Sequence, residues 1–201
     1  MSEDYFARLS TVLNRHTAIP PEEFDKLINI TRLIQVKKDD YFTRAGEDCP
    51  WLGFIIKGVF RCFYLDETGT EYIKHFFQED DFMVSNTQAL IDEEPEGRKA
   101  DYFIQALEDS LVLKIGINKF KGLFTLQPCW QKVFMKEIER VRRIEHRRVK
   151  QLLSEDAETR YANFKEDFPG LEERIKQAQI AAYLGISPVS LSRIRGKQQS
   201  I

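Results

Sequence analysis

Apolar residues in the first 30 positions recur at the three- and four-residue spacing of a helix that buries one face. In the first segment this face consists of Phe6, Leu9, Val12 and Leu13. The pair Pro20–Pro21 opens a second segment, and proline suits the first position of a helix because its missing N–H would have no partner there. The pattern predicts two amphipathic helices before residue 31.

Between residues 31 and 117 the pattern changes to short apolar runs that are separated by turn residues. The predicted strands are residues 33–36, 52–56, 59–65, 71–77, 101–106 and 111–115. Many short strands at close intervals are typical of a small antiparallel barrel or roll. A short helix is expected to follow at residues 117–124.

A long helix is predicted from about residue 128 to residue 153. Its apolar stripe, which Glu145 interrupts, consists of Trp130, Phe134, Ile138, Val141, Val149 and Leu152. A stripe of this length could cover the chain's own barrel or form a coiled-coil seam with a second copy. We expect both uses, with Phe134, Ile138 and Val141 at a dimer interface.

The segment from Ser154 to Glu158 combines a capping residue with acidic side chains, which indicates the start of a new helix. The predicted fold class is therefore α+β, with three parts. These parts are an antiparallel roll with flanking helices (residues 1–126), a long dimerisation helix (127–153) and an all-helical unit (154–201).

The last 30 residues show the spacing of two short helices joined by a sharp turn. Ile180 and Leu184 share one face of the first helix, and Gly185 suits the left-handed conformation that ends it. Ser187 and Pro188 then form a capping pair for the second helix, whose Leu191 and Ile194 point back toward the first. This is the layout of a DNA-binding helix-turn-helix, although an ordinary helical hairpin shares some of these features.

Side chains on the other face of this unit are the candidate DNA contacts. They are Lys176, Gln177, Ser187, Val189, Ser190, Arg193 and Lys197. Arg193 is expected to contact a base, and Lys176 or Lys197 a phosphate of double-stranded DNA.

Charge agrees with this division of the chain. The 201 residues carry a formal net charge of −2, and the isoelectric point is about 6.0. From Leu171 onward, however, five basic residues stand against two acidic ones. A protein that coats nucleic acid without sequence preference would be strongly basic throughout, so this class is excluded. The chain has no apolar run long enough for a bilayer and no signal-peptide pattern, and a cytoplasmic location is expected.

Residues with metal-binding or redox chemistry are few and far apart. The three cysteines are Cys49, Cys62 and Cys129, and the three histidines are His16, His75 and His146. No two have the spacing of metal ligands, and an odd number of distant cysteines argues against a disulfide framework. A cupin-like enzyme would need clustered histidines in the barrel, where only His75 falls. We therefore expect no metal site, no catalytic residues and no enzyme.

In the order of its parts the chain resembles the Crp/Fnr family of bacterial transcription regulators, and it looks most like the short branch common in Bacteroidetes-type genomes. The resemblance covers nearly the whole chain, and its local marks are residues 58–64, 66–71, 106–110, 157–161, 183–187 and 191–193. It implies a roll of the double-stranded β-helix type, similar to a cyclic-nucleotide-binding domain, that senses a small molecule. It also implies a homodimer whose recognition helices enter adjacent major grooves, with RNA polymerase as a further candidate partner.

The sequence departs from the family pattern where cyclic-nucleotide binders hold a phosphate. Residues 80–90 and 95–100 lack the Gly-Glu pair of that cassette. The remaining candidate effector-binding residues are Ser85, Asn86, Arg98 and Lys99. Acidic residues surround Arg98 and oppose anion binding there. Cyclic AMP is therefore not expected as a cofactor, which leaves another small effector or none.

The helix-turn-helix also departs from the family. Pro188 and Val189 occupy positions where the family often has Arg-Glu. Val189 cannot accept a hydrogen bond from cytosine but can contact a thymine methyl group, so a different target site is expected. The segment from Phe168 to Ile175 is too short for the usual wing hairpin.

A ligand-binding module that acts on a protein partner is the alternative function.

Overall fold

Two four-stranded antiparallel sheets form the centre of the computed structural model, which describes residues 2–86 and 99–198. The first sheet has the order β1 (Thr31–Val36), β8 (Ser110–Gly116), β3 (Trp51–Lys57), β6 (Phe82–Met83). The second has the order β2 (Tyr41–Thr43), β7 (Phe103–Ala106), β4 (Phe60–Leu65), β5 (Glu71–Phe77). The predicted antiparallel roll is confirmed, but β2 and β6 are absent from the prediction because two or three residues show no alternating pattern.

The roll interior is a packed apolar layer between the two sheets. Successive side chains of a strand point to opposite faces, so each sheet contributes alternate residues to this layer. Phe60, Met83, Ile104 and Val112 are completely buried within it.

Three helices cover the outer face of the first sheet. They are α1 (Ser2–Asn14), α2 (Pro21–Ile30) and α4 (Ile117–Leu126), and they confirm the helices predicted on both sides of the roll. The long helix α5 (Pro128–Ser154) is anchored here, because Trp130 is fully buried and donates from Nε1 to Glu23 at 3.1 Å. Glu23, itself only 3 % exposed, also pairs with Lys26 at 2.5 Å, which satisfies its charge.

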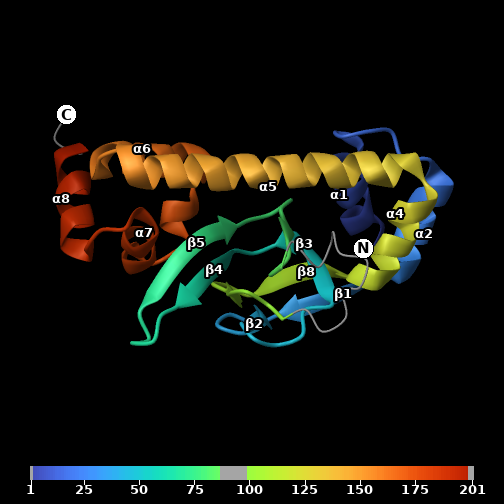
Figure 1. Cartoon of the computed structure of the whole chain (residues 1–201), viewed down its shortest axis with the longest axis horizontal. Coiled ribbons are helices and arrows are strands. Elements are labelled where there is room, and N and C mark those ends of the chain that lie inside the picture. The colour runs from blue at the N-terminus through green and yellow to red at the C-terminus, as the bar shows by residue number, and fades with distance from the viewer. Residues whose placement is uncertain (1, 87–98, 199–201) are drawn as a thin grey trace.

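Helix α5 extends along the whole molecule, from α4 at one end to the C-terminal helices at the other (Figure 1). Its two ends are packed differently. Trp130 and Val133 in the first turns are buried. In the last turns Val149 is 55 %, Leu152 47 % and Leu153 81 % exposed.

The C-terminal part comprises α6 (Ala157–Asp167), a 3-10 turn (Leu171–Glu173), α7 (Gln177–Leu184) and α8 (Pro188–Gln198). The N-cap of α6 is Asp156, whose carboxylate accepts from the N–H of Thr159 at 2.8 Å. The predicted cap, Ser154, is instead the last residue of α5, and its hydroxyl donates to the carbonyl of Lys150 at 2.8 Å. Helix α6 therefore starts later than the sequence suggested.

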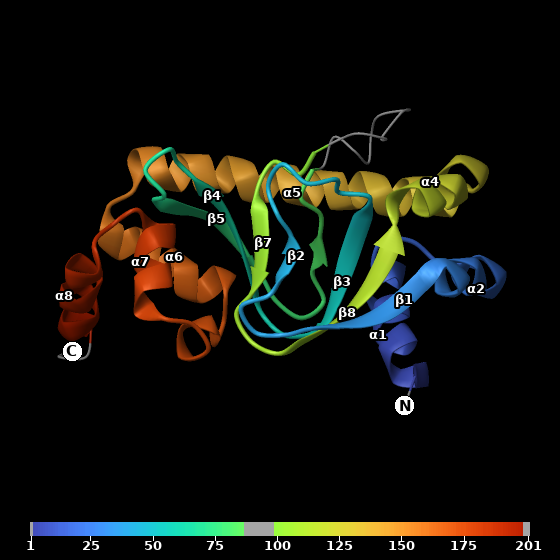
Figure 2. The same ribbon diagram turned by 90° about the horizontal axis from the view of Figure 1, so that it is seen from below.

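The C-terminal helices lie directly beside the roll, where α7 packs against β5 (Figure 2). One buried apolar cluster contains Phe63 and Phe76 of the roll together with Phe164 and Leu184 of the C-terminal part. The roll and the C-terminal part therefore share this core. No helix within residues 2–86 and 99–198 has the length and apolar character required to span a membrane.

Candidate nucleic-acid interface and ligand cavity

The turn between α7 and α8 has the geometry that the sequence predicted. Gly185 ends α7 with a φ of 68°, a left-handed conformation that favours glycine. Ser187 Oγ accepts from the N–H of Ser190 at 3.1 Å, while Pro188 occupies the first position of α8. These local interactions fix the angle at which α8 leaves the turn.

The inner faces of the two helices pack against each other as predicted. Ile180, Ala181, Leu184 and Leu191 are completely buried, and Ile194 is nearly so. The small side chain of Ala181 allows the helices to approach closely. The helix-turn-helix is therefore a packed unit and not only a sequence pattern.

The outer face of α8 carries predicted DNA contacts and lies at one end of the molecule (Figure 1). Val189 is 62 % exposed. Arg193 is exposed and has no ion pair within residues 2–86 and 99–198. Lys197 pairs with Glu158 of α6 at 2.6 Å, so a phosphate would have to compete with this carboxylate. Ser190, at the start of the helix, is half-buried, and its hydroxyl lies 2.9 Å from that of Ser187.

Lys176 and Gln177 are exposed at the start of α7. The N–H of Lys176 donates to Gln179 Oε1 at 3.1 Å, which fixes the first turn of the helix. Residues 171–173 before it form a 3-10 turn in the place of a wing hairpin.

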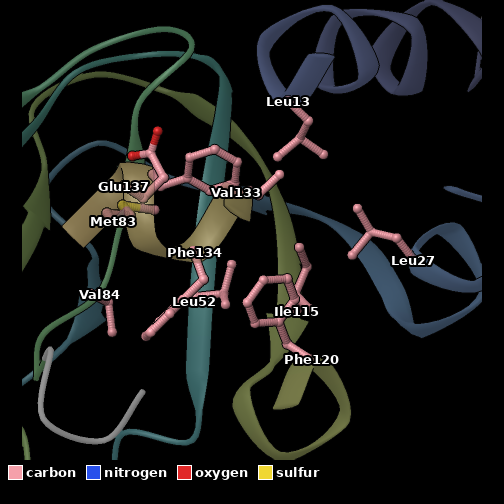
Figure 3. A pocket seen from close by; sticks show the side chains of 11 residues that line it. Leu13, Leu27, Leu52, Met83, Val84, Ile115, Phe120, Val133, Phe134 and Glu137 are labelled. Carbon is pink, nitrogen blue, oxygen red and sulfur yellow. The ribbon is translucent and has the colours of Figure 1, made fainter. Parts of the chain in front are cut away.

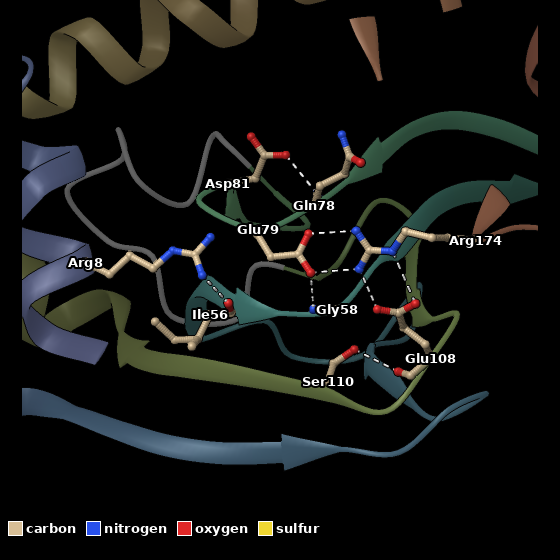
Figure 4. A network of polar contacts seen from close by, with 9 residues as sticks. All are labelled: Arg8, Ile56, Gly58, Gln78, Glu79, Asp81, Glu108, Ser110 and Arg174. Atoms are coloured by element: carbon tan, nitrogen blue, oxygen red, sulfur yellow. Dashed lines mark hydrogen bonds and ion pairs between the residues drawn. The ribbon is translucent and has the colours of Figure 1, made fainter. Parts of the chain in front are cut away.

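An ion-pair cluster attaches the C-terminal helices to the roll (Figure 4). Arg174 donates to Glu79 at 2.7 and 2.8 Å and to Glu108 at 2.5 Å. Glu79 also accepts from the N–H of Gly58 at 2.8 Å. Gly58 has a φ of +119°, and a Cβ atom there would lie 2.0 Å from Ser110 Oγ, so this turn requires glycine. Burial opposes ionisation of Glu79, but its hydrogen bonds outweigh burial and lower its pKa to about 2.

Aromatic rings complete this attachment. Phe76 of β5 lies 5.5 Å from the ring of Tyr183 in α7 and 5.8 Å from that of Phe168. The guanidinium of Arg148, from α5, lies 3.8 Å above the ring of Tyr183 and donates to the Tyr183 carbonyl. The roll, α5 and the helix-turn-helix therefore meet at Tyr183.

A cavity of about 400 Å³ lies between the roll and α5, and we call it the roll–α5 cavity. Its wall is mainly aromatic and aliphatic, with Tyr64, Phe77, Phe82, Tyr102, Val141 and Ile144 among its residues. Lys74 of β5 crosses to α5 and pairs with Glu145 at 2.9 Å, and its Nζ lies 4.4 Å from the centre of the Tyr102 ring. The cavity therefore offers an apolar chamber in which the charge of Lys74 is neutralised, and Arg140 and Arg148 also line it.

Burial decides the charge of two other groups in this cavity. It raises the pKa of the Cys62 thiol to about 12, so the thiol stays protonated. It lowers the pKa of His75 to about 3, with the charges of Arg140, Lys74 and Arg148 acting in the same direction. Neither a thiolate nor an imidazolium is present at neutral pH.

The predicted effector residues lie elsewhere. The buried hydroxyl of Ser85 contacts Cys49 Sγ, and Asn86 donates to the carbonyl of Lys99 at 2.9 Å. Lys99 Nζ pairs with Asp48 at 2.7 Å, while Arg98 falls outside the described residues. Ser85, Asn86 and Lys99 are thus brought together, but none lines the roll–α5 cavity. Lys74 and Glu145, two of the polar residues of this cavity, come from separate elements of the chain. No local sequence motif relates them.

The three predicted dimer residues differ in their surroundings. Phe134 packs within its own chain, 4.8 Å from the ring of Phe124, and lines a small cavity of about 70 Å³ under α1 and α4 (Figure 3). Val141 lines the roll–α5 cavity. Ile138 is half-buried and lines neither of these two cavities. Within residues 2–86 and 99–198 no three His, Cys, Asp or Glu side chains are grouped as metal ligands.

Comparison with known proteins gives a match in structure only. No family model matches the sequence, and no curated protein matches it. The fold is similar to FixK2 from Bradyrhizobium japonicum, with a TM-score of 0.73 and 13 % identity over 85 % of each chain. It is also similar to the c-di-GMP-responsive global regulator CLP from Xanthomonas campestris, with a TM-score of 0.71 and 14 % identity over 90 % of this chain and 92 % of that one.

A third similar structure is a regulator from Eubacterium rectale that is placed in the Crp/Fnr family. It has a TM-score of 0.70 and 16 % identity, over 90 % of this chain and 84 % of the other. At these identities the likeness establishes the fold. The chain has the architecture of Crp/Fnr regulators, from the roll through α5 to the helix-turn-helix.

Proposed function

We propose that this chain is a DNA-binding transcription regulator of the Crp/Fnr type. The observation that carries the proposal is the outer face of α8, where Val189 and Arg193 are exposed at the end of the molecule. An exposed arginine on a recognition helix can bind guanine through two hydrogen bonds. The shared architecture supports this role. DNA binding implies action in the cytoplasm, with RNA polymerase as a candidate partner.

We also propose that the chain acts as a homodimer with its seam along α5. Ile138 and Val149 are about three helical turns apart and so share a face. Val149, Leu152 and Leu153 are exposed apolar side chains on the last turns of α5. Phe134 packs against Phe124 of its own chain, and Val141 is half-buried on the wall of the roll–α5 cavity, which Val149 also lines. Ile138 and the more exposed residues of the last turns are therefore the better candidates for the centre of the seam.

Selection of DNA from a random pool tests both parts of the proposal. A dimeric helix-turn-helix protein should enrich sites with two-fold symmetry whose half-sites are about one helical turn apart. Enrichment of single half-sites would leave DNA binding intact and contradict the dimer. A pool without any enriched sequence would contradict the proposal and favour a ligand-binding module that regulates a protein partner.

A small effector is proposed to bind in the roll–α5 cavity. Its volume, about 400 Å³, is typical of a small-molecule site. We propose that cyclic AMP is not this effector, because its ribose hydroxyl needs an acceptor such as a carboxylate, and Glu145, the carboxylate among the described lining residues, is already paired with Lys74. Titration calorimetry should show no binding at physiological concentrations. A micromolar dissociation constant that is lost in Arg98→Ala would overturn this view.

We infer no catalytic role for the roll–α5 cavity. A nucleophile needs a lowered pKa or an adjacent base, whereas the Cys62 thiol is held protonated by burial. His75 stays neutral and buried, with aromatic neighbours Phe77 and Phe168 at 5.1 and 5.3 Å. These residues pack the cavity wall.

A further inference from the structure

A second cavity lies where the roll, α5 and the helix-turn-helix meet, and we call it the junction cavity. It has a volume of about 260 Å³, and Gln151, Asp167 and Tyr183 are among its lining residues. It shares His75, Arg140, Ile144 and Arg148 with the roll–α5 cavity. The two cavities therefore adjoin at these side chains.

Two buried hydrogen-bond donors lack partners at this junction. They are Arg148 Nη1 and Gln151 Nε2, and no other buried side-chain nitrogen or oxygen atom of the described residues is unpaired. Gln151 is only 3 % exposed. The two residues are three positions apart, so their side chains are neighbours on one face of α5. Native structures rarely leave buried donors unpaired, and two unpaired neighbours indicate that an acceptor binds between them.

The charges around the junction cavity leave Arg148 without a counter-ion. Each lining carboxylate already has its own arginine. These pairs are Glu79 with Arg174 at 2.7 Å, Asp81 with Arg140 at 3.1 Å, and Asp167 with Arg147 at 2.6 Å. Arg148 has no carboxylate partner within residues 2–86 and 99–198.

The backbone compensates this charge only in part. Arg148 donates to the carbonyl of Tyr183, and Arg160 donates to that of Leu184 at 3.0 Å, both at the C-terminal end of α7. A helix end carries only about half a negative charge, and here two guanidinium groups share it. Water could satisfy the two unpaired donors but would add no negative charge. An anion does both.

We propose that Arg148 and Gln151 bind the carboxylate of a small organic acid whose apolar or aromatic body occupies the roll–α5 cavity. The guanidinium and the amide both present N–H groups, which suit the two oxygens of one carboxylate. The aromatic wall beside them, with Tyr64, Phe77 and Tyr102, suits a ring or an alkyl chain. This inference rests on the proposed function, because it names the chemical class of the effector that was proposed there.

The site also provides a route from the effector to the DNA-binding unit. The guanidinium that would bind the carboxylate is the one that stacks on Tyr183 and donates to its carbonyl. A ligand that prefers one position of Arg148 would therefore favour one position of α7, and with it of α8.

A first experiment needs no ligand. In Gln151→Glu a carboxylate replaces the amide beside Arg148, and Gln151→Met removes the amide without adding charge. Because the new carboxylate would neutralise Arg148, the glutamate variant should melt at a higher temperature than both the wild type and the methionine variant at pH 7. A glutamate variant that does not melt above both of these proteins would show that Arg148 does not lack an anion, and would overturn the proposal.

A second experiment measures binding by titration calorimetry in the absence of DNA. The probes are phenylacetate, indole-3-acetate and octanoate. The controls are 2-phenylethanol, an uncharged analogue, and inorganic phosphate, an anion without an apolar organic group. At least one acid should bind the wild type, about tenfold or more tighter than 2-phenylethanol and phosphate. That binding should weaken by about tenfold or more in Gln151→Glu and Arg148→Gln. Arg143→Gln, which changes an exposed arginine of the same helix, should stay within about twofold of the wild type.

Each contrary result has a definite meaning. If none of the three acids binds, or if Gln151→Glu binds them as the wild type does, the site is refuted. Phosphate that binds as tightly as the best acid would refute the organic body in the roll–α5 cavity. Because DNA is absent from these titrations, a negative result would not contradict the proposal of DNA binding. In the same way, a DNA selection without enriched sequences would not contradict this ligand site.

Discussion

The helix-turn-helix has one side toward solvent and one toward the roll, and the two sides are held by contacts of very different range. On the solvent side the turn is fixed by neighbours, such as the hydrogen bond from the N–H of Ser190 to Ser187 Oγ. On the roll side, Arg174 binds Glu79, which is 95 residues away in the chain. The recognition helix therefore has a locally encoded shape but a position that depends on distant partners. Substitutions on the inner side should move or loosen the unit, whereas those on the outer side should change DNA contacts alone.

The largest effect is expected on the inner side, at Phe76. This ring is fully buried and contacts Phe164, Phe168 and Tyr183. Phe76→Ala should lower the free energy of unfolding by about 3–5 kcal/mol, because it leaves a cavity where the roll meets the C-terminal helices. Urea denaturation measures the loss.

The matched control is Tyr72→Ala, which truncates an exposed aromatic side chain on the same strand. It should change stability by less than about 1 kcal/mol. Equal effects of the two substitutions would show that the packing of α7 on β5 adds nothing to the stability of the fold.

The next effect concerns the proposed dimer. Ile138→Glu would place an unpaired charge at the centre of the α5 seam, so we expect the dimer dissociation constant to rise about a hundredfold or more. Lys132→Glu, on an exposed face of the same helix, is the control and should leave the dimer intact. Sedimentation equilibrium distinguishes them, and an Ile138→Glu protein that remains dimeric would place the interface elsewhere.

On the outer side, Arg193→Ala should weaken binding to the selected site by about 1–3 kcal/mol and relax the preference at one base pair of each half-site. Its stability should not change, because the side chain is exposed and without an ion pair among the described residues. Wild-type affinity of Arg193→Ala for the selected site would refute its role as the base contact.

Lys197→Ala serves as the contrast to Arg193. A phosphate contact carries no sequence information, so its loss should weaken binding to all sequences alike and flatten the salt dependence by about one unit. The ion pair of Lys197 with Glu158 must be released first, which should make this effect smaller than that at Arg193. A change in base preference would contradict the assignment.

The same contrast in range explains how much of the molecule the sequence could predict. Gly185, Ser187 and Pro188 indicate a turn within four residues, and the structure has that turn. The helices, the longer strands and the roll follow from periodicity in the same way. Local capping is harder to assign where two candidates lie two residues apart, as Ser154 and Asp156 do.

The polar residues that join the parts of the molecule could not be found in this way. Arg174 is one basic residue among many until the fold brings Glu79 and Glu108 beside it. Likewise, Arg148 is one of several basic residues on α5, yet it is half-buried against Tyr183. Only the tertiary structure shows which arginines have partners and which do not.

The smallest effect is expected at the attachment through Arg174. Because Arg174 and Glu79 are partly exposed, with 32 % and 25 % of their side chains accessible, solvent screening reduces the energy of the pair. We expect Arg174→Met to lower the free energy of unfolding by about 1 kcal/mol at pH 7. Lys37→Met, which removes an exposed partner of Asp109, is the control and should have less effect.

The pH dependence of this difference identifies its cause. The pKa of Glu79 is lowered from 4.5 to about 2 in the folded protein, so the folded state binds fewer protons than the unfolded state between these values. The stability that the carboxylate adds is therefore complete above pH 4.5 and is lost as the pH falls toward 2. His75, whose pKa is lowered from 6.5 to about 3 by burial, also destabilises the fold as the pH falls below 6.5, but it does so in both proteins. The difference in unfolding free energy between wild type and Arg174→Met should thus be constant from pH 7 to 5 and shrink from pH 4.5 downward. A difference that vanished between pH 7 and 5 would show that the pair of Arg174 with Glu79 is not its cause.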